Sequence, residues 1–239
     1  IDTICGSFFF FFIPTGASDP YALRRQGIGL LQIILENGFA LGINDLIRMS
    51  LSTFTDIAPH ISPEEAAEQV ASFLMNRLAH ILESEGVAKD AVAAVLAVSQ
   101  SEGVPVIAEK ARSLQRLKTE PEFETLAIGF KRVVNIIRKA DPADTAKEGV
   151  EPSLFEYPAE KGLFEKFSAI QKQVGQLLAK RQIDEAFTAV STLRTPVDQF
   201  FDDVLVMTDD AAVRRNRLAL LSQISRLFAL LADFSRIST

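Results

Sequence analysis

Two short basic stretches hold the side chains whose types and spacing suit a chemical task. One lies within residues 129–140 and the other within residues 213–221. The planar arginine fork suits phosphates and stacks on bases, and an asparagine amide reads the edge of a base, so both stretches fit an RNA loop. The alternative is a solvated, salt-bridged surface, because Asp209 and Asp210 lie close to the second stretch. The candidate residues are Lys131, Arg132, Asn135, Arg138, Arg214, Arg215, Asn216 and Arg217.

The sequence contains no constellation of residues that predicts catalysis. His60 and His80 are far apart, and we expect the first in a loop and the second partly buried in an apolar helix. The chain has no glycine-rich phosphate cradle, nucleophile elbow or zinc motif. The acid pairs at 202–203 and 209–210 are typical of solvated helix faces or helix N-termini. We therefore predict no catalytic residue, no metal site and no cofactor in this chain.

Composition limits the classes of protein that remain. The 239 residues are 48% hydrophobic, which is enough for a sizeable core and excludes an intrinsically disordered chain. Twenty-five Lys and Arg against 31 Asp and Glu give a formal charge of -6, which excludes a uniformly basic nucleic-acid-coating protein but leaves local basic patches open. The single cysteine, Cys5, cannot form an internal disulfide and favours a reducing, cytoplasmic setting.

The most apolar segment is Ile1–Pro14, which contains the run Phe8–Phe12. It is shorter than the roughly 20 residues needed to cross a bilayer and has no basic segment before it, so we predict neither a membrane span nor a secretory signal. Dense aromatic runs usually fill an interior, which favours a buried helix or strand. A membrane-facing or partner-facing surface is the alternative.

Capping signals and apolar periodicity indicate helices almost throughout. Ser62, Pro63 and Glu65 form a capping box with proline at the first helical position. Residues 141–158 are rich in proline and acids and are predicted to form a connecting loop. No convincing period-two strand is present, so the predicted fold class is all-α. The expected helices cover about 21–36, 62–86, 88–98, 104–117, 119–140, 159–180, 183–193, 197–207 and 209–235.

The basic stretch at 129–140 lies in one of these helices. Helical spacing puts Lys131, Asn135 and Arg138 on one face while Val133 and Ile136 point inward. This helix has no acidic residue from 125 to 140. Near the other end of the chain, Arg24 and Arg25 follow an Asp-Pro cap, and here we favour a buried ion pair that braces the helix over contact with RNA.

Several motif blocks resemble one known family. The segments TPVDQFFDDVLVM (195–207), RRNRLALLSQI (214–224) and LADFSRI (231–237) resemble the anticodon-binding domain of the bacterial glycyl-tRNA synthetase beta subunit, and GFKRVVNIIRKA (129–140) resembles its first helix. The segments DTICG (2–6) and PTGASDPYALRRQGIG (14–29) resemble the part that follows the family's HD-like domain. The Phe8–Phe12 run is more aromatic than that family pattern. A metal-dependent HD phosphohydrolase is disfavoured because the chain has no His-Asp doublet.

The resemblance implies a C-terminal fragment with two helical parts. Residues 1–117 are expected to include the trailing edge of the HD-like domain, and residues 118–239 to form an anticodon-binding helical bundle. The complete ligase is an aminoacyl-tRNA synthetase that attaches glycine to its tRNA using ATP, and its catalytic core belongs to the alpha subunit. The implied partners are therefore glycine tRNA and the alpha subunit, with this fragment non-catalytic. The alternative is a helical scaffold that docks the alpha subunit while RNA is held elsewhere.

Overall fold

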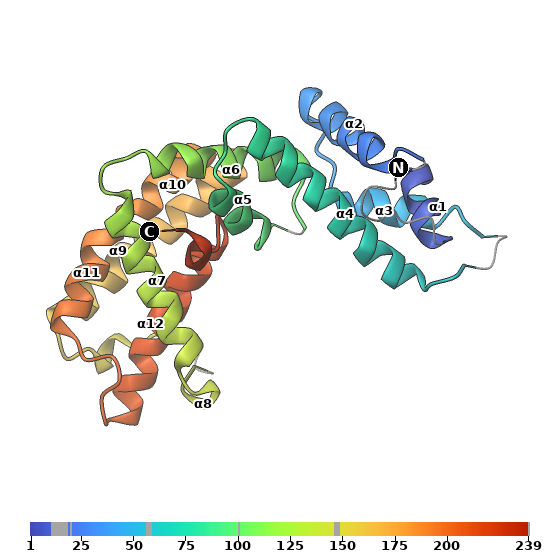
Figure 1. The fold of residues 1–239 in the computed structure, drawn as a ribbon. Coiled ribbons are helices and arrows are strands. Elements are labelled where there is room, and N and C mark those ends of the chain that lie inside the picture. Colours follow the sequence, from blue (N-terminus) through green and yellow to red (C-terminus); the bar gives the residue numbers. More distant parts are fainter. Residues whose placement is uncertain (11–18, 20, 56–58, 100, 146–148, 239) are drawn as a thin grey trace. The chain divides into compact units, whose positions relative to one another are not determined.

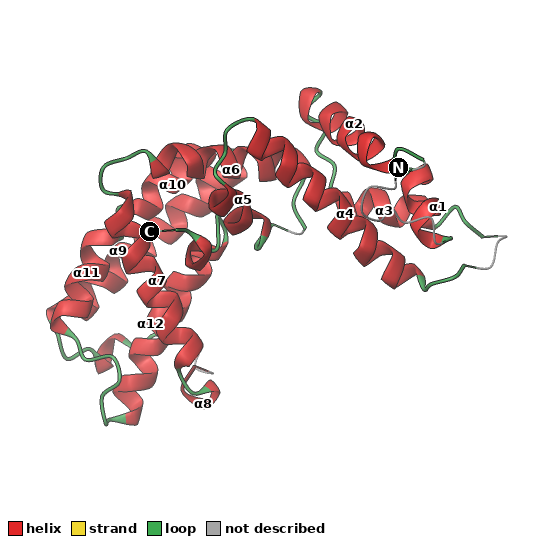
Figure 2. Cartoon of the chain, viewed as in Figure 1, coloured by secondary structure: helices red, strands yellow, loops and turns green. Residues whose placement is uncertain are grey.

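A computed structural model describes residues 1–10, 19, 21–55, 59–99, 101–145 and 149–238. Every regular element in these ranges is a helix, and the only β-type pairing in them is a single bridge between Gly42 and Gly103 (Figure 2). The predicted all-α fold class is confirmed. The chain packs as two compact units, Ile1–Arg112 (unit 1) and Ser113–Thr239 (unit 2).

Unit 1 is organised around one long helix, α4 (Pro63–Ser84). Helices α1 (Asp2–Phe9), α2 (Leu23–Glu36), α3 (Ile43–Leu51) and α5 (Lys89–Leu96) all pack against it. Helix α4 begins as its capping signal predicts, because the Ser62 hydroxyl accepts a hydrogen bond from the Glu65 amide at 3.1 Å. Gly86 follows its end with φ +93°, a conformation that glycine adopts without strain.

Helix α2 begins later than the sequence indicates. The expected start was Tyr21, but Ala22 has a left-handed φ of +53°, so the helix starts at Leu23. The Asp19 carboxylate still caps it and accepts hydrogen bonds from the amides of Leu23 and Arg24 at 2.8 and 3.1 Å. Arg24 is half-buried and Arg25 is exposed.

The aromatic run contributes to the core of unit 1. Phe8 and Phe9, at the end of α1, are buried, and the Phe8 ring lies 5.3 Å from the ring of Phe73 on α4. Phe11 and Phe12 lie outside the described residues. In the part of the chain that the structure describes, no helix combines the length and apolarity needed to span a membrane.

Helix α6 (Val104–Lys118) leads into unit 2. This unit is a bundle built on its two longest helices, α12 (Ala211–Ala229) and α9 (Pro158–Ala179). Figure 1 shows α12 (orange-red) alongside α7 (Phe123–Lys139, lime), and the two helices pack together. Helices α10 (Ile183–Ser191) and α11 (Arg194–Asp203) pack on α9, and α11 also packs on α7. The remaining short elements are α8 (Pro142–Thr145) and the 3-10 helices Pro152–Leu154 and Phe234–Arg236.

Three phenylalanine rings join α7, α12 and the C-terminal 3-10 helix. The Phe130 ring of α7 stacks on Phe228 of α12 with centroids 3.7 Å apart, and Phe234 meets it edge-on at 5.0 Å. All three rings are almost fully buried. The cluster fixes the inner face of α7 against α12, so the opposite face of α7 is directed away from this core.

Several expected element boundaries in unit 2 differ from the structure. The segment 141–158 is not a plain loop, because it contains α8 and a 3-10 turn. The expected break at 194–196 is absent from α11, since Pro196 lies in the first turn of this helix, where its missing N–H is not needed. Helix α11 ends at Asp203, and residues 204–210 form an irregular segment before α12.

Candidate nucleic-acid interface

Helix α7 separates an apolar face from a basic one. Leu126, Phe130 and Val133 are buried, whereas Arg132 and Arg138 are exposed. We call the outward set the α7 basic face; it consists of Lys131, Arg132, Asn135, Arg138 and Lys139. Because α7 has no acid after Glu124, no carboxylate of its own helix neutralises this face. As helical spacing predicts, Lys131, Asn135 and Arg138 lie along one side of α7.

Local contacts orient two of these side chains. An Arg138 Nη2 group donates a hydrogen bond to the Asn135 amide oxygen at 2.8 Å. The guanidinium carbon of Arg132 lies 4.1 Å from the ring centroid of Phe201, which belongs to α11. Within the described residues, neither Arg132 nor Arg138 has an ion-pair partner. Both cations are therefore available to an anionic ligand.

Two adjoining recesses hollow the surface at Arg132 and Ile136. The helix recess, of about 450 Å³, lies along α7 and is lined by Ile128, Lys131, Arg132, Asn135, Ile136 and Lys139. The loop recess, of about 470 Å³, is lined by Arg132, Ile136 and residues 201–207. Sequence reasoning missed the contribution of Phe201 and of the 204–207 segment, because helical periodicity placed these residues inside a longer helix.

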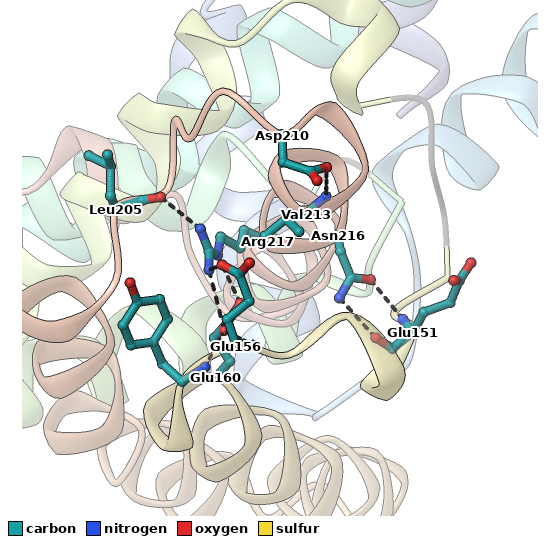
Figure 3. Close-up of polar contacts among 9 residues, drawn as sticks. Glu151, Glu156, Glu160, Leu205, Asp210, Val213, Asn216 and Arg217 are labelled. Atoms are coloured by element: carbon teal, nitrogen blue, oxygen red, sulfur yellow. Dashed lines mark hydrogen bonds and ion pairs between the residues drawn. The ribbon is translucent and has the colours of Figure 1, made fainter.

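The second basic stretch, on α12, lies in a different environment from the one expected. Arg217 has a side chain only 2% exposed, and its Nε donates to the Glu160 carboxylate at 2.8 Å (Figure 3). Its two Nη groups donate to Glu156 at 2.7 Å and to the backbone carbonyl of Leu205 at 3.1 Å. Burial by itself lowers the pKa of the guanidinium, but Glu160 and Glu156 outweigh burial and raise that pKa above its ordinary value.

Glu160 is as deeply buried as its partner and also caps a helix. Its side chain is 1% exposed and accepts hydrogen bonds from the amides of Glu156 and Tyr157 at 2.7 and 2.9 Å. Tyr157 is the N-cap residue of α9, so this carboxylate holds the start of the helix. Arg217 thus joins α12, the N-terminus of α9 and the 204–207 segment.

The neighbouring residues of α12 also point toward protein. The buried Asn216 amide oxygen accepts a hydrogen bond from the Glu151 N–H at 2.7 Å, and its amide nitrogen donates to the Glu151 carbonyl at 3.0 Å. Arg214 pairs with Asp144 of α8 at 2.8 Å, which raises the pKa of this guanidinium, and donates to the Thr208 carbonyl at 2.8 Å. Arg215 alone of this stretch is exposed.

The structure therefore separates the candidate residues into two groups. The α7 residues and Arg215 lie at least partly at the surface, while Asn216 and Arg217 are buried and Arg214 is engaged with α8. The physical reason is that α12 is packed by α7, α8 and α9, so little of its circumference remains for solvent. The expectation of a solvent-facing helix at 213–221 holds only for Arg215.

The other titratable candidates have structural positions. Asp210 caps α12, where the amides of Val213 and Ala212 donate to its carboxylate and lower its pKa. Asp202 and Asp203 are exposed at the end of α11, as expected of solvated acids. His60 is exposed, and His80 is exposed too rather than partly buried. Among the described residues, no group of histidine, cysteine and acidic side chains is arranged to hold a metal ion.

Two family models match the chain. The model described as glycyl-tRNA synthetase beta subunit matches residues 1–97, and the model described as DALR anticodon binding domain matches residues 126–235. The first match contains α1–α5, and the second contains the α7 basic face, α11 and α12.

Curated relatives match the whole length of this chain. The glycine–tRNA ligase beta subunit of Desulfatibacillum aliphaticivorans is 43% identical over 239 residues, which are 100% of this chain and 34% of the relative. The beta subunits of Desulforapulum autotrophicum and Syntrophotalea carbinolica are 44% and 41% identical over 99% and 100% of this chain, again with 34% of each relative covered. The chain thus spans about a third of the length of these relatives.

Proposed function

Since the chain belongs to the glycyl-tRNA synthetase beta subunit family and contains a DALR anticodon-binding domain, we propose that residues 118–239 hold the anticodon end of glycine tRNA. The observation that carries this proposal is the α7 basic face, which lies inside the matched domain and has no acid of its own helix to neutralise it. Cationic side chains that meet phosphates supply most of the sequence-independent affinity for RNA.

The roles divide according to burial. Lys131, Arg132, Asn135 and Arg138 contact RNA from α7, and Arg215 contacts it from α12. Arg214, Asn216 and Arg217 brace the bundle from within, because their polar groups already bind protein partners. The net charge of -6 supports a localised contact, since excess acidic charge elsewhere on the chain confines RNA to the basic face.

The proposed activity of the complete enzyme requires more than this chain. As the family resemblance implies, the complete synthetase joins glycine to tRNA with ATP, together with an alpha subunit that carries the catalytic core. This chain contributes the grip on tRNA, and no step of the reaction with ATP is assigned to its residues. A helical scaffold that docks the alpha subunit is the competing function.

Charge reversal on α7 distinguishes the two functions. Lys131→Glu with Arg138→Glu should abolish binding of glycine tRNA in a filter-binding assay and leave assembly with the alpha subunit intact. Arg226→Glu, an exposed arginine near the end of α12, is the matched control and should leave both properties unchanged. Loss of assembly with retained tRNA binding in the α7 double variant would favour the scaffold.

A further inference from the structure

A groove of about 940 Å³ runs between α3 and α4 in unit 1, and we call it the α3–α4 groove. Figure 1 shows the two helices side by side, and they pack together. The lining positions recur at steps of three and four, so each helix presents one stripe to the groove. From Glu64 to Met75 the α4 stripe is about 16 Å long, or about three helical turns. These positions include 44, 47 and 51 on α3 and 64, 68, 71 and 75 on α4.

The floor of the groove is apolar. Ile47 is fully buried, whereas Leu51 and Met75 are only half-buried and so keep apolar surface in contact with solvent. Two further lining residues on α4, Ala67 and Ala71, have small side chains that let the backbone of a second element approach closely. The floor therefore offers apolar surface at a place where another element can pack against α4.

The edge of the groove carries negative charge that the protein itself does not neutralise. Glu64 and Glu68 are exposed, and neither has an ion-pair partner in the part of the chain that the structure describes. The cation that α3 contributes, Arg48, is already paired with Asp45 at 2.9 Å. Glu64 lies in the first turn of α4, where a carboxylate stabilises the start of the helix. Glu68 lies beyond that turn, so its charge has no such role.

These features favour a helix over other ligands. Every regular element in the described ranges is a helix, so they offer no strand to which an extended peptide could add. A small-molecule site places polar groups in its interior, whereas Asn44, Ser52 and Ser72 are exposed at the edge of this groove. A helix with an apolar face fills a groove between two helices, and cations beside that face complement Glu64 and Glu68.

We propose that the α3–α4 groove binds a helix of a partner protein that is apolar on one face and carries lysine or arginine along the border of that face. The apolar face packs on Ile47, Leu51 and Met75, and a cation of the partner pairs with Glu68. This interaction surface goes beyond the proposed function. It lies in unit 1 and does not depend on the tRNA contact proposed for residues 118–239, so the two proposals can fail separately.

The three methionines of the chain allow the site to be located by NMR. Met75 lines the groove, Met49 is 69% exposed on α3 and does not line it, and Met207 belongs to unit 2. The chain, labelled with carbon-13 at its methionine methyl groups, is titrated with a peptide of about 18 residues, long enough to form a helix, in which leucine recurs at helical spacing and lysine flanks the leucines. The Met75 signal should shift until the groove is saturated, and the Met207 signal should stay in place. The same peptide with glutamate in place of lysine should bind at least about tenfold more weakly, because it brings like charges together.

Charge reversal at the edge of the groove tests the contribution of the acid. Glu68→Lys should weaken binding of the lysine peptide by about fivefold, the factor expected for loss of one exposed ion pair. Glu36→Lys makes the same change at an exposed residue of α2 outside the groove and is the matched control, which should leave the affinity unchanged. Ala71→Arg should abolish binding, because its side chain enters the groove. Circular dichroism melts of each variant establish that it is folded, and Glu68→Lys tests the proposal even if Ala71→Arg does not fold.

Four results would overturn the inference. Equal affinity for the lysine and glutamate peptides would mean that the groove does not select cations. An equal loss in Glu68→Lys and Glu36→Lys would mean that the peptide responds only to overall charge. An unmoved Met75 signal, whether or not Met207 shifts, would mean that the groove binds no basic helix. If the Met75 signal shifts as the concentration of the chain alone rises, a second copy of the chain occupies the groove instead of a partner.

Discussion

Removing Arg217 should destabilise unit 2 strongly, because the change leaves a buried carboxylate without its cation. Arg217→Met removes the cation from the Glu160 side chain, which is 1% exposed in the parent chain, and removes the donor from the Leu205 carbonyl. Breaking a buried pair from one side costs about 3–5 kcal/mol. Glu160 keeps two backbone donors, so we expect the lower end, about 3 kcal/mol, which corresponds to a fall in Tm of roughly 10 °C.

A double-mutant cycle isolates the contribution of the pair. Glu160→Gln preserves shape and one acceptor, and alone it should cost a similar amount because Arg217 then faces a neutral amide. The variant with both changes should be less destabilised than the sum of the single variants, by about 2 kcal/mol, in urea denaturation followed by circular dichroism. Additivity within about 0.5 kcal/mol would refute the reasoning, because it would mean that the two side chains act independently.

Three further predictions concern stability and reactivity. Asn216→Ala removes both hydrogen bonds to the Glu151 backbone and should cost about 1–3 kcal/mol in urea denaturation, whereas no loss would contradict a bracing role. Because amide donors lower the pKa of Asp210, its stabilisation of α12 is present above the unfolded value near 4 and is lost as the pH falls through the folded value. Asp210→Asn should therefore flatten the acid limb of the pH–stability curve, and an unchanged limb would contradict the cap. Burial raises the pKa of the Cys5 thiol, so it should react with a disulfide reagent only as unit 1 unfolds in urea; immediate reaction of the native chain would contradict its burial.

The fold class and the main helix of unit 1 could be predicted because their signals are local. The Ser62 cap and the amphipathic spacing of α4 depend only on neighbouring residues, and both are present in the structure. The start of α2 could not be predicted, since nothing in the sequence specifies a left-handed φ at Ala22. The end of α11 at Asp203 could not be predicted either, since Val204 and Val206 continue an apolar pattern but lie buried in an irregular segment.

The outward orientation of the basic residues was predictable on α7, whereas the burial of Asn216 and Arg217 on α12 was not, and the difference lies in the packing. On α7 the polar and apolar residues alternate with helical period, so the outward face follows from spacing alone. On α12 the run Leu218–Leu221 is apolar on every side, which is typical of a helix buried all round. That signal, together with the capping carboxylate of Glu160, indicates that Arg217 points inward. The recess at Leu205 required the structure, because its wall comes from an irregular segment.

The most direct test of the central claim is the salt dependence of binding between this chain and glycine tRNA. Binding should be tight at low salt and weaken steeply as salt rises, and Lys131→Ala or Arg138→Ala should each reduce the slope of log affinity against log salt by about 0.7. Arg226→Ala should leave the slope unchanged. Equal slopes for all variants, or no binding at low salt, would contradict an RNA grip by the α7 basic face.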